Sequence, residues 1–419
     1  MKKIKFIAAA NLRLGAPFTG FGSWNPQERI SRILAEAPLL AFERLINFCL
    51  EQNTDFLILS GDILGPSPLD PTVRKTFTDG LSRLSEAEIH VILTEDVKNK
   101  LYLKTLSENE EKIICLNSDG LQHFSITLQD GASVLIQGLT ASFKNMETPF
   151  AILEQAGDKK SDNLKIGLFP LPIDEAALEK SHKLLMEKLN ACGFNIILSP
   201  GARSREIRKK TPSVFSSGYF CSRSISETMP GACLLIQASK EENWTFTTEY
   251  PDLSTLPVRR IELNIDNMET EKEIKQLVYH SLEELLAALP PYATGALAHV
   301  RICGHARLAG QRGMINTPSE FSDILLHFMN NKPPVLAVIK DVPAFGTEFE
   351  NRNDLPGVLF KVARELEADK NALALFIADC QKPLNISGRT DILNTPALNK
   401  ANSDLIIDAE QRCQFLLEN

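Results

Sequence analysis

The sequence has no apolar run that approaches the roughly 18 residues of a membrane-spanning helix. Its first residues include two early lysines, but no sustained apolar segment follows them. These absences predict a soluble, cytoplasmic protein that does not enter a membrane. The chain also has no excess of positive charge, since 45 Lys and Arg stand against 53 Asp and Glu, for a net charge of −8. This balance excludes a protein that is basic all over, but a local basic face would still suit nucleic acid.

Cysteine pairs with the C-x-x-C spacing of zinc or redox sites are also absent. The eight cysteines are scattered, and some lie inside apolar runs, such as Cys115 and Cys233. This distribution predicts buried, reduced thiols rather than disulfides or a zinc site. Histidine is scarce, with seven in 419 residues, and this scarcity matters for the metal chemistry considered below.

The composition that remains is that of an ordinary globular protein, with 43% hydrophobic and 23% charged residues. A chain of 419 residues is too long for one core, so two or three domains are expected. We place the first domain at residues 1–252, a small α+β accessory domain at 257–347, and a helical C-terminal region at 348–419. No internal repeat or low-complexity segment interrupts this plan.

The first domain begins with alternating strand and helix patterns. Residues 5–10 and 56–59 are apolar runs typical of buried parallel strands, and residues 30–50 between them have apolar positions at helical spacing. Residues 73–84 and 89–93 predict a second helix and a third strand. Together they indicate an α/β fold built from right-handed β-α-β units.

Shorter segments follow, and they predict further layers. Three alternating segments suggest an antiparallel sheet layered on the first, at residues 113–116, 121–128 and 133–138. Residues 164–169 and 194–198 predict two more buried strands around a helix over 174–189. In the accessory domain the pattern predicts strand, helix and strand, at residues 258–265, 271–289 and 298–304.

The carboxyl ends of the predicted strands carry the polar residues of interest, because chemistry collects at such ends in an open α/β sheet. Asp62 follows the second strand after Ser60 and Gly61. Its carboxylate either caps the following turn or pairs with a neighbour, unless it acts in catalysis. None of the seven histidines follows a strand at this edge; His90 opens a strand and His182 lies in a predicted helix.

In chain order, the strand ends resemble those of the calcineurin-like metallophosphoesterase family, within the branch of the SbcD and YhaO DNA repair exonucleases. That family carries A-D-x-H-x-G, G-D, G-N-H-D, a lone His and G-H-x-H at these places. The framework is similar as well: residues 41–62 resemble its A-F…D-F-x-L-x-x-G-D stretch, and residues 223–231 its R-x-x-N-E-T-x-P-x-G segment. The resemblance covers nearly the whole chain and implies a four-layer β-sandwich flanked by helices.

The resemblance also implies a two-metal centre, in which paired divalent ions clamp the attacking water and the scissile phosphate. Of the seven family ligands, only the bridging Asp is kept, as Asp62. The first Asp matches Asn11, its His partner matches Arg13, and an arginine does not bind metal. The family's Asn ligand and its catalytic His fall on Val97 and Lys98, and the other ligands fall on Phe169 or Pro170, Pro200 and Ala202. We therefore expect no bound metal, with Arg13 or Lys98 pairing with Asp62 in its place.

Two functions from different classes remain open, and a third interpretation is a scaffold with no DNA role. The first is a catalytically inactive homologue that binds DNA or an ATPase partner; the second is an active nuclease or phosphoesterase with a rebuilt site. The rebuilt site would hold Mn²⁺ or Mg²⁺ on Asp62, Asp96 and either Asn11 or Asn99.

Basic residues near the strand ends are either solvated loop charges or contacts for DNA phosphates. The DNA-binding candidates are Arg13, Lys98, Arg203, Arg205, Arg208 and Lys209, with Lys210 beside them. A second cluster, in the accessory domain, consists of Arg301, His305, Arg307 and Arg312. The resemblance further implies a coiled-coil ABC-type ATPase (SbcC-like) as partner, and a homodimer is compatible. An apolar face over residues 405–417 would dock on another protein or pack on its own domain.

Overall fold

The computed structural model describes these parts of the chain: residues 2–19, 28–66, 68–94, 97–116, 122–128, 131–138, 163–168, 193–201, 204–208, 212–224, 227, 232–265, 268, 270–303 and 321–340. The chain divides into two compact units, the first formed by residues 1–261, 282–299 and 325–338. The second is formed by residues 262–281, 300–324 and 339–419. The predicted helical region 348–419 lies outside the described residues, and the domain limits stay predictions.

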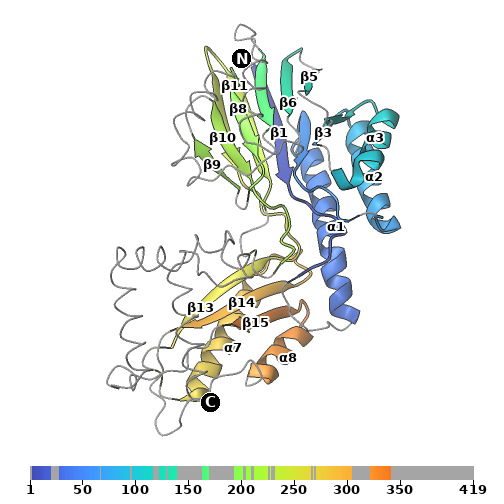
Figure 1. Ribbon diagram of the computed structural model, residues 1–419. Helices are drawn as coiled ribbons and strands as arrows, with labels where there is room; N and C mark the ends of the chain where they lie inside the picture. Colours follow the sequence, from blue (N-terminus) through green and yellow to red (C-terminus); the bar gives the residue numbers. More distant parts are fainter. Residues whose placement is uncertain are drawn as a thin grey trace, which may run out of the picture. The chain divides into compact units, whose positions relative to one another are not determined.

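The first sheet has six strands in the order β12-β11-β1-β2-β3-β4 (Figure 1). Their bounds are β1 Lys2–Ala10, β2 Phe56–Ser60, β3 His90–Thr94, β4 Ile113–Leu116, β11 Leu234–Lys240 and β12 Trp244–Glu249. Strands β1 to β4 pair in parallel, and β11 and β12 add antiparallel strands beyond β1. The predicted α/β class is confirmed.

Strand β4 corrects one prediction. We expected residues 113–116 in a second, antiparallel sheet, whereas β4 pairs in parallel with β3 in the first sheet. Parallel pairing needs a crossover connection, and helix α3, Lys100–Asn109, supplies it after a short 3-10 turn, η1, Val97–Asn99. The sequence patterns had predicted no helix at this place.

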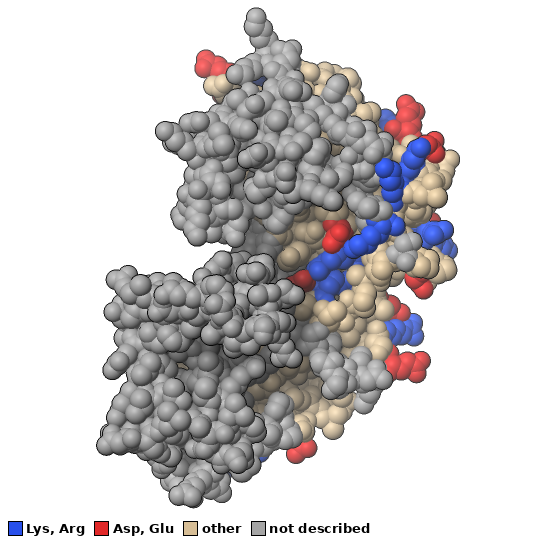
Figure 2. Space-filling model, viewed as in Figure 1, with Lys and Arg blue, Asp and Glu red and all other residues tan. Residues whose placement is uncertain are grey.

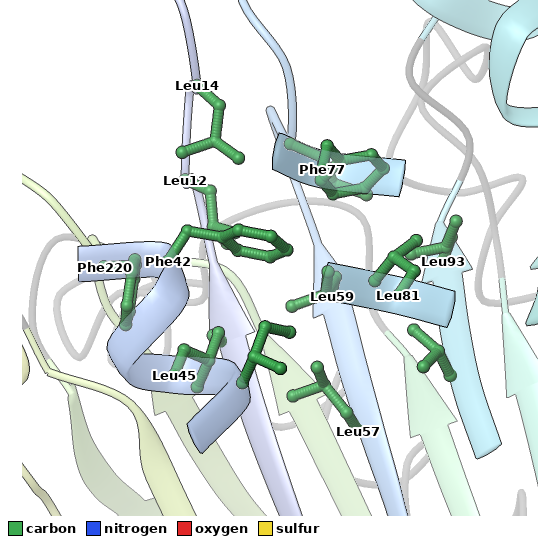
Figure 3. Packing of buried hydrophobic residues seen from close by; sticks show 14 of the residues in the cluster. Leu12, Leu14, Phe42, Leu45, Leu57, Leu59, Phe77, Leu81, Leu93 and Phe220 are labelled. Carbon is green, nitrogen blue, oxygen red and sulfur yellow. The ribbon is translucent and has the colours of Figure 1, made fainter. Parts of the chain in front are cut away.

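Helices α1, Glu28–Glu51, and α2, Pro71–Glu86, lie on one face of the first sheet together with α3. The N-terminus of helix α2 is capped by Asp70, whose side chain accepts a hydrogen bond from the Thr72 N–H at 2.7 Å. Pro71 occupies the first turn of the helix. Phe42 of α1 and Phe77 of α2 lie 5.4 Å apart between ring centroids, above Leu59 of β2 (Figure 3). This cluster fixes the helices on the sheet.

The second sheet has the order β5-β6-β7-β8-β10-β9. Its strands are β5 Gln122–Thr127, β6 Ser133–Gly138, β7 Leu164–Leu168, β8 Ile196–Ser199, β9 Ser204–Arg208 and β10 Ser213–Ser217. Its four central strands are parallel, and only the edge pairs β5–β6 and β9–β10 are antiparallel. The predicted strands at 164–169 and 194–198 are confirmed, while the predicted helix over 174–189 lies outside the described residues.

The two sheets pack face to face over one hydrophobic core. Ile136, Ile166 and Ile196 contribute from neighbouring strands of the second sheet, and Phe6 and Phe56 of the first sheet stack with ring centroids 4.6 Å apart. Every second residue of these strands points into this core, and in β2 the residues between them, Leu57 and Leu59, pack under the helices on the other face of the first sheet. The predicted β-sandwich is confirmed.

A third sheet has the order β13-β14-β15. Its strands are β13 Val258–Asn264, β14 Ala296–Cys303 and β15 Val335–Lys340, and the chain also forms helices α7, Glu271–Ala287, and α8, Ser322–Asn330. The predicted strand, helix and strand of this region are confirmed. Within the described residues, no helix is long and apolar enough to cross a membrane.

Candidate site at the ends of strands β1 and β2

The loops that follow β1 and β2 are joined to each other by backbone hydrogen bonds. The sheet pairing ends at Ala10 and Ser60, but the Arg13 N–H donates to the Asp62 carbonyl at 2.9 Å and the Leu14 N–H to the Ile63 carbonyl at 3.1 Å. Parallel strands end at the same edge of a sheet, and these bonds carry their pairing into the loops. The sequence-predicted residues Asn11, Arg13 and Asp62 therefore lie together.

The backbone at this edge has several residues in the left-handed region. Asn11 has φ 54°, Arg13 has φ 46° and Gly61 has φ 70°. For a residue other than glycine this conformation costs free energy and persists only where the surroundings impose it. A Cβ atom on Gly61 would collide with the Asn11 Oδ1 atom, so any other residue there would both strain the backbone and displace the Asn11 side chain.

The side-chain oxygen of Asn11 is already used in a hydrogen bond. Its Oδ1 atom accepts a hydrogen bond from the Asp62 backbone N–H at 3.2 Å. The side chain of Asp62 is exposed, and within the described residues no ion pair or hydrogen bond reaches its carboxylate. The expected pairing of Asp62 with Arg13 or Lys98 is wrong.

Arg13 instead pairs with Glu227, a residue 214 positions away in the chain. Arg13 Nη1 donates to Glu227 Oε1 at 3.0 Å and Nη2 to Oε2 at 2.6 Å, so the contact is bidentate. Nη2 also donates to the Cys221 carbonyl at 3.3 Å, and the guanidinium lies 4.8 Å from the Tyr219 ring centroid. The two side chains are only 20% and 19% exposed, so solvent screens this pair weakly.

Arg223 completes the network from the buried side. Its Nε and Nη2 atoms donate to the Arg13 carbonyl at 3.2 and 3.0 Å, while its backbone N–H donates to Glu227 Oε2 at 2.7 Å. Burial lowers the pKa of the Arg223 guanidinium to about 10, which still leaves it charged at neutral pH. The Glu227 carboxylate thus receives donors from both Arg13 and Arg223. We call Arg13, Glu227 and Arg223 the arginine network.

Glu227 was missed as a site residue. Residues 223–231 entered the sequence analysis only as part of the family framework, although that segment contains a glutamate at a fixed place. A mostly buried arginine at position 13 requires a counter-charge, and this requirement was a signal that could have directed attention to Glu227. What the sequence does not contain is the path of the chain that brings the glutamate back to β1.

The segment after β3 joins this edge of the sheet through the side-chain amide of Asn99. Asn99 is buried and its Nδ2 atom donates to the Gly65 carbonyl at 3.0 Å, which ties the turn after β3 to the loop after β2. Lys98 beside it is exposed, and Pro200 is buried at the end of β8. Val97 lies in η1.

Other predicted residues are only partly described. Strand β9 contains Arg205 and Arg208, whose backbone pairs with β10 and whose side chains are not described. Arg301 lies in β14. The predicted residues outside the described part are Asp96, Phe169, Pro170, Ala202, Arg203, Lys209, Lys210, His305, Arg307 and Arg312.

The described residues do not fit a two-metal centre. Arg13 and Asn11 lie where the resemblance implies ligands, but the Arg13 guanidinium binds a carboxylate and the Asn11 amide oxygen accepts a backbone N–H. Among the residues that the structure describes, no group of three or more His, Cys, Asp or Glu could hold a metal ion.

In Figure 2, Lys and Arg side chains form a row on the side that carries α1 and α2 in Figure 1, with single acidic side chains beside it.

No protein-family model and no curated protein matches this chain. Its structure is similar to TT1561 of Thermus thermophilus, with a TM-score of 0.37 and 12% identity over 60% of this chain and 100% of that one. It is also similar to a dimetal phosphatase from Danio rerio, with a TM-score of 0.32 and 9% identity over 60% of this chain and 98% of that one. The site is therefore interpreted from its own residues.

Proposed function

We propose that this chain is a catalytically silent relative of the SbcD and YhaO exonucleases that acts as a binding subunit. The observation that carries the proposal is the Arg13–Glu227 ion pair. It places a neutralised cation where the resemblance puts a metal-binding histidine. The order of strand ends and the sandwich of two six-stranded sheets support the family part of the proposal.

A nuclease and phosphatase assay with Mn²⁺ tests the silent site. We expect no turnover above background, and the same result for Asp62→Ala. The Arg13–Glu227 contact fills the site with protein charges, and one carboxylate cannot clamp two ions. Cleavage by the wild-type chain that disappears in Asp62→Ala would overturn the proposal.

The second candidate function is metal-dependent catalysis at a rebuilt site around Asp62. One observation favours it: the Asp62 carboxylate is exposed at the strand end and has no partner within the described residues. Its proposed helpers are less available, because the Asn11 Oδ1 atom accepts a hydrogen bond from the Asp62 backbone and Asn99 is buried. Calorimetric titration with Mn²⁺ tests this candidate, and binding that requires Asp62 would favour it.

As a binding subunit, the chain would contact DNA phosphates with basic residues near the strand ends. Lys98 is exposed in η1, and β9, which carries Arg205 and Arg208, is an edge strand of the second sheet. We expect DNA affinity to fall with rising salt and to weaken in a double variant with Arg203→Glu and Arg205→Glu. Unchanged affinity in that variant, beside an Arg32→Glu control on the exposed face of α1, would leave only the scaffold interpretation.

The proposed protein partner is a coiled-coil ABC-type ATPase, which rests on the family resemblance. The apolar face over residues 405–417 is the proposed docking segment and lies outside the described residues. Deleting the residues after 400 distinguishes docking from packing. Loss of partner binding in a soluble truncated chain supports docking, and loss of solubility supports a core role.

A further inference from the structure

The arginine network contains more positive than negative charge. Arg13 and Arg223 supply two guanidinium groups, while Glu227 supplies one carboxylate. Within the described residues, no other carboxylate contacts either guanidinium, and Asp62 on the neighbouring loop makes no ion pair with them. The side chains of Arg13 and Glu227 are only 20% and 19% exposed. An uncompensated positive charge in such a place favours the binding of an anion.

The network also has one donor more than Glu227 binds. The Nε atom of Arg13 is buried and, within the described part of the chain, has no hydrogen-bond partner. Both oxygens of Glu227 are engaged elsewhere, because Oε1 accepts from Arg13 Nη1 and Oε2 accepts from Arg13 Nη2 and the Arg223 N–H. A buried donor without an acceptor is rare in proteins and requires an explanation. A tetrahedral oxyanion, with three or four oxygens, has an acceptor for each of these donors.

The donors are held in place by contacts that do not involve Glu227. The Arg13 carbonyl accepts two hydrogen bonds from the Arg223 guanidinium, at 3.2 and 3.0 Å. Arg13 Nη2 donates to the Cys221 carbonyl at 3.3 Å, and the Arg13 guanidinium lies 4.8 Å from the centroid of the Tyr219 ring. These contacts remain when the carboxylate moves away. The site is therefore preorganised for an oxyanion, which lowers the cost of binding one.

The backbone around Glu227 is fixed independently of its carboxylate. The Glu227 N–H donates to the Ser224 carbonyl at 3.0 Å, and the Glu227 carbonyl accepts from the Ser222 hydroxyl at 2.8 Å. These bonds hold the turn, while the side chain itself is partly exposed to solvent. Opening the pair with Arg13 therefore requires only rotation about the side-chain bonds of Glu227.

We propose that the arginine network is a binding site for a phosphate dianion, and that Glu227 is its internal competitor. A phosphate monoester carries nearly two charges at neutral pH, so it balances both guanidinium groups where one carboxylate balances only one. A phosphodiester carries a single charge and has no such advantage over Glu227. The ligand is therefore a free or terminal phosphate. The site rests on the contacts above, and only a nucleic-acid source of the phosphate rests on the proposed function.

Isothermal titration calorimetry with sodium phosphate tests the site, with sodium chloride at matched ionic strength as the blank. We expect Glu227→Ala to bind inorganic phosphate about tenfold more tightly than the wild-type chain, because a competitor that leaves the site open in about a tenth of the molecules reduces affinity by that factor. Glu227→Gln keeps the volume of the side chain and should show a gain as well, which covers the case that Glu227→Ala does not fold. Phosphate should also raise the midpoint of thermal unfolding in both variants.

Two control variants decide whether the gain comes from this site. In Glu227→Ala combined with Arg13→Met the gain should disappear, because the pair of Nη donors is gone. Asp62→Ala removes the same charge from the same edge of the sheet without touching the network, and should leave the phosphate affinity within about twofold of wild type because solvent screens an exposed charge. An equal gain in Asp62→Ala, a gain that survives Arg13→Met, or no gain in either Glu227 variant would overturn the proposal.

The source of the phosphate is tested with a single-stranded oligonucleotide that carries either a 5′-phosphate or a 5′-hydroxyl group. If the ligand is a strand terminus, Glu227→Ala should bind the phosphorylated strand more tightly, and Arg13→Met should remove the difference. Equal binding of the two strands, beside tight binding of inorganic phosphate, would overturn the nucleic-acid source and assign the site to free phosphate. Unchanged DNA affinity in the double variant with Arg203→Glu and Arg205→Glu would instead contradict only the proposed function.

Discussion

Two carboxylates near the same edge of the first sheet have opposite surroundings. Asp62 follows β2, is exposed and has no partner within the described residues, while Glu227 is mostly buried and receives three hydrogen bonds from Arg13 and Arg223. The residue that a family motif marks as a ligand therefore contributes little structure, and the residue of the framework segment carries the electrostatics. The counter-charge of Arg13 comes from the segment after β10 and not from the residue that follows β2.

The largest expected effect comes from removing the counter-charge. Glu227→Gln keeps the shape of the side chain but leaves two guanidinium groups facing an uncharged amide. Breaking a mostly buried pair in this way costs about 3 kcal/mol of the free energy of unfolding, as measured by urea denaturation. In a double-mutant cycle, Arg13→Met should recover part of the loss; strict additivity would contradict the contact.

A smaller effect is expected at the turn that holds the two loops together. Gly61→Ala should lower the free energy of unfolding by about 2 kcal/mol, because the residue has positive φ and its new Cβ would meet the Asn11 Oδ1 atom. In an Asn11→Gly background the clash is gone and only the backbone strain remains. The loss should then be about 1 kcal/mol, and an equal loss in both backgrounds would argue against the close approach.

The pH dependence of stability that comes from His90, at the amino end of β3, gives a reference that does not involve the arginine network. Burial, with Lys112 nearby, lowers the pKa of His90 below its ordinary value, against the smaller opposing effect of Glu88 and Glu111. Its stabilising contribution is therefore complete above the unfolded-state pKa near 6.5 and is lost as the pH falls through the lower folded-state value. Denaturation from pH 7.5 downward should show this decline in wild type and Glu227→Gln alike, and less of it in His90→Gln.

The smallest effect is expected at Asp62. Asp62→Asn should change the free energy of unfolding by no more than about 0.5 kcal/mol, because an exposed carboxylate without a partner contributes little. Thermal denaturation of Asp62→Asn beside Glu227→Gln gives the comparison directly. A destabilisation at Asp62 as large as that at Glu227 would show that the two carboxylates are equivalent after all.

Much of the fold was predictable because local pattern and burial agree. The apolar runs before Asn11 and Asp62 are buried on both faces, and this is the signature that single-sequence patterns report best. Helix α3 was missed because few of its apolar residues recur at helical spacing. Leu103 and Leu106 are buried, but Leu101 is 79% exposed. Without that helix, β4 could not be assigned to the parallel sheet.

The site was predictable only where neighbouring strands determine it. Asn11, Arg13 and Asp62 meet because β1 and β2 are adjacent and parallel, and a β-α-β pattern indicates that adjacency. The Arg13–Glu227 contact joins residues 214 positions apart, and it depends on how the chain returns after β10. No local pattern contains that path, so the partner of Arg13 had to come from the structure.

The loops after β1 and β2 are held to each other mainly by backbone hydrogen bonds, which continue the pairing of the two strands. The main chain holds the positions of residues 11, 13 and 62 through bonds between backbone atoms, although the positive φ of residues 11 and 13 disfavours β-branched side chains there. Side chains there can be exchanged without rebuilding the loops, provided that Gly61 stays and that Arg13 and Glu227 change together. The chain is thus a ready scaffold for installing a designed ligand set on a pre-formed pair of strand ends.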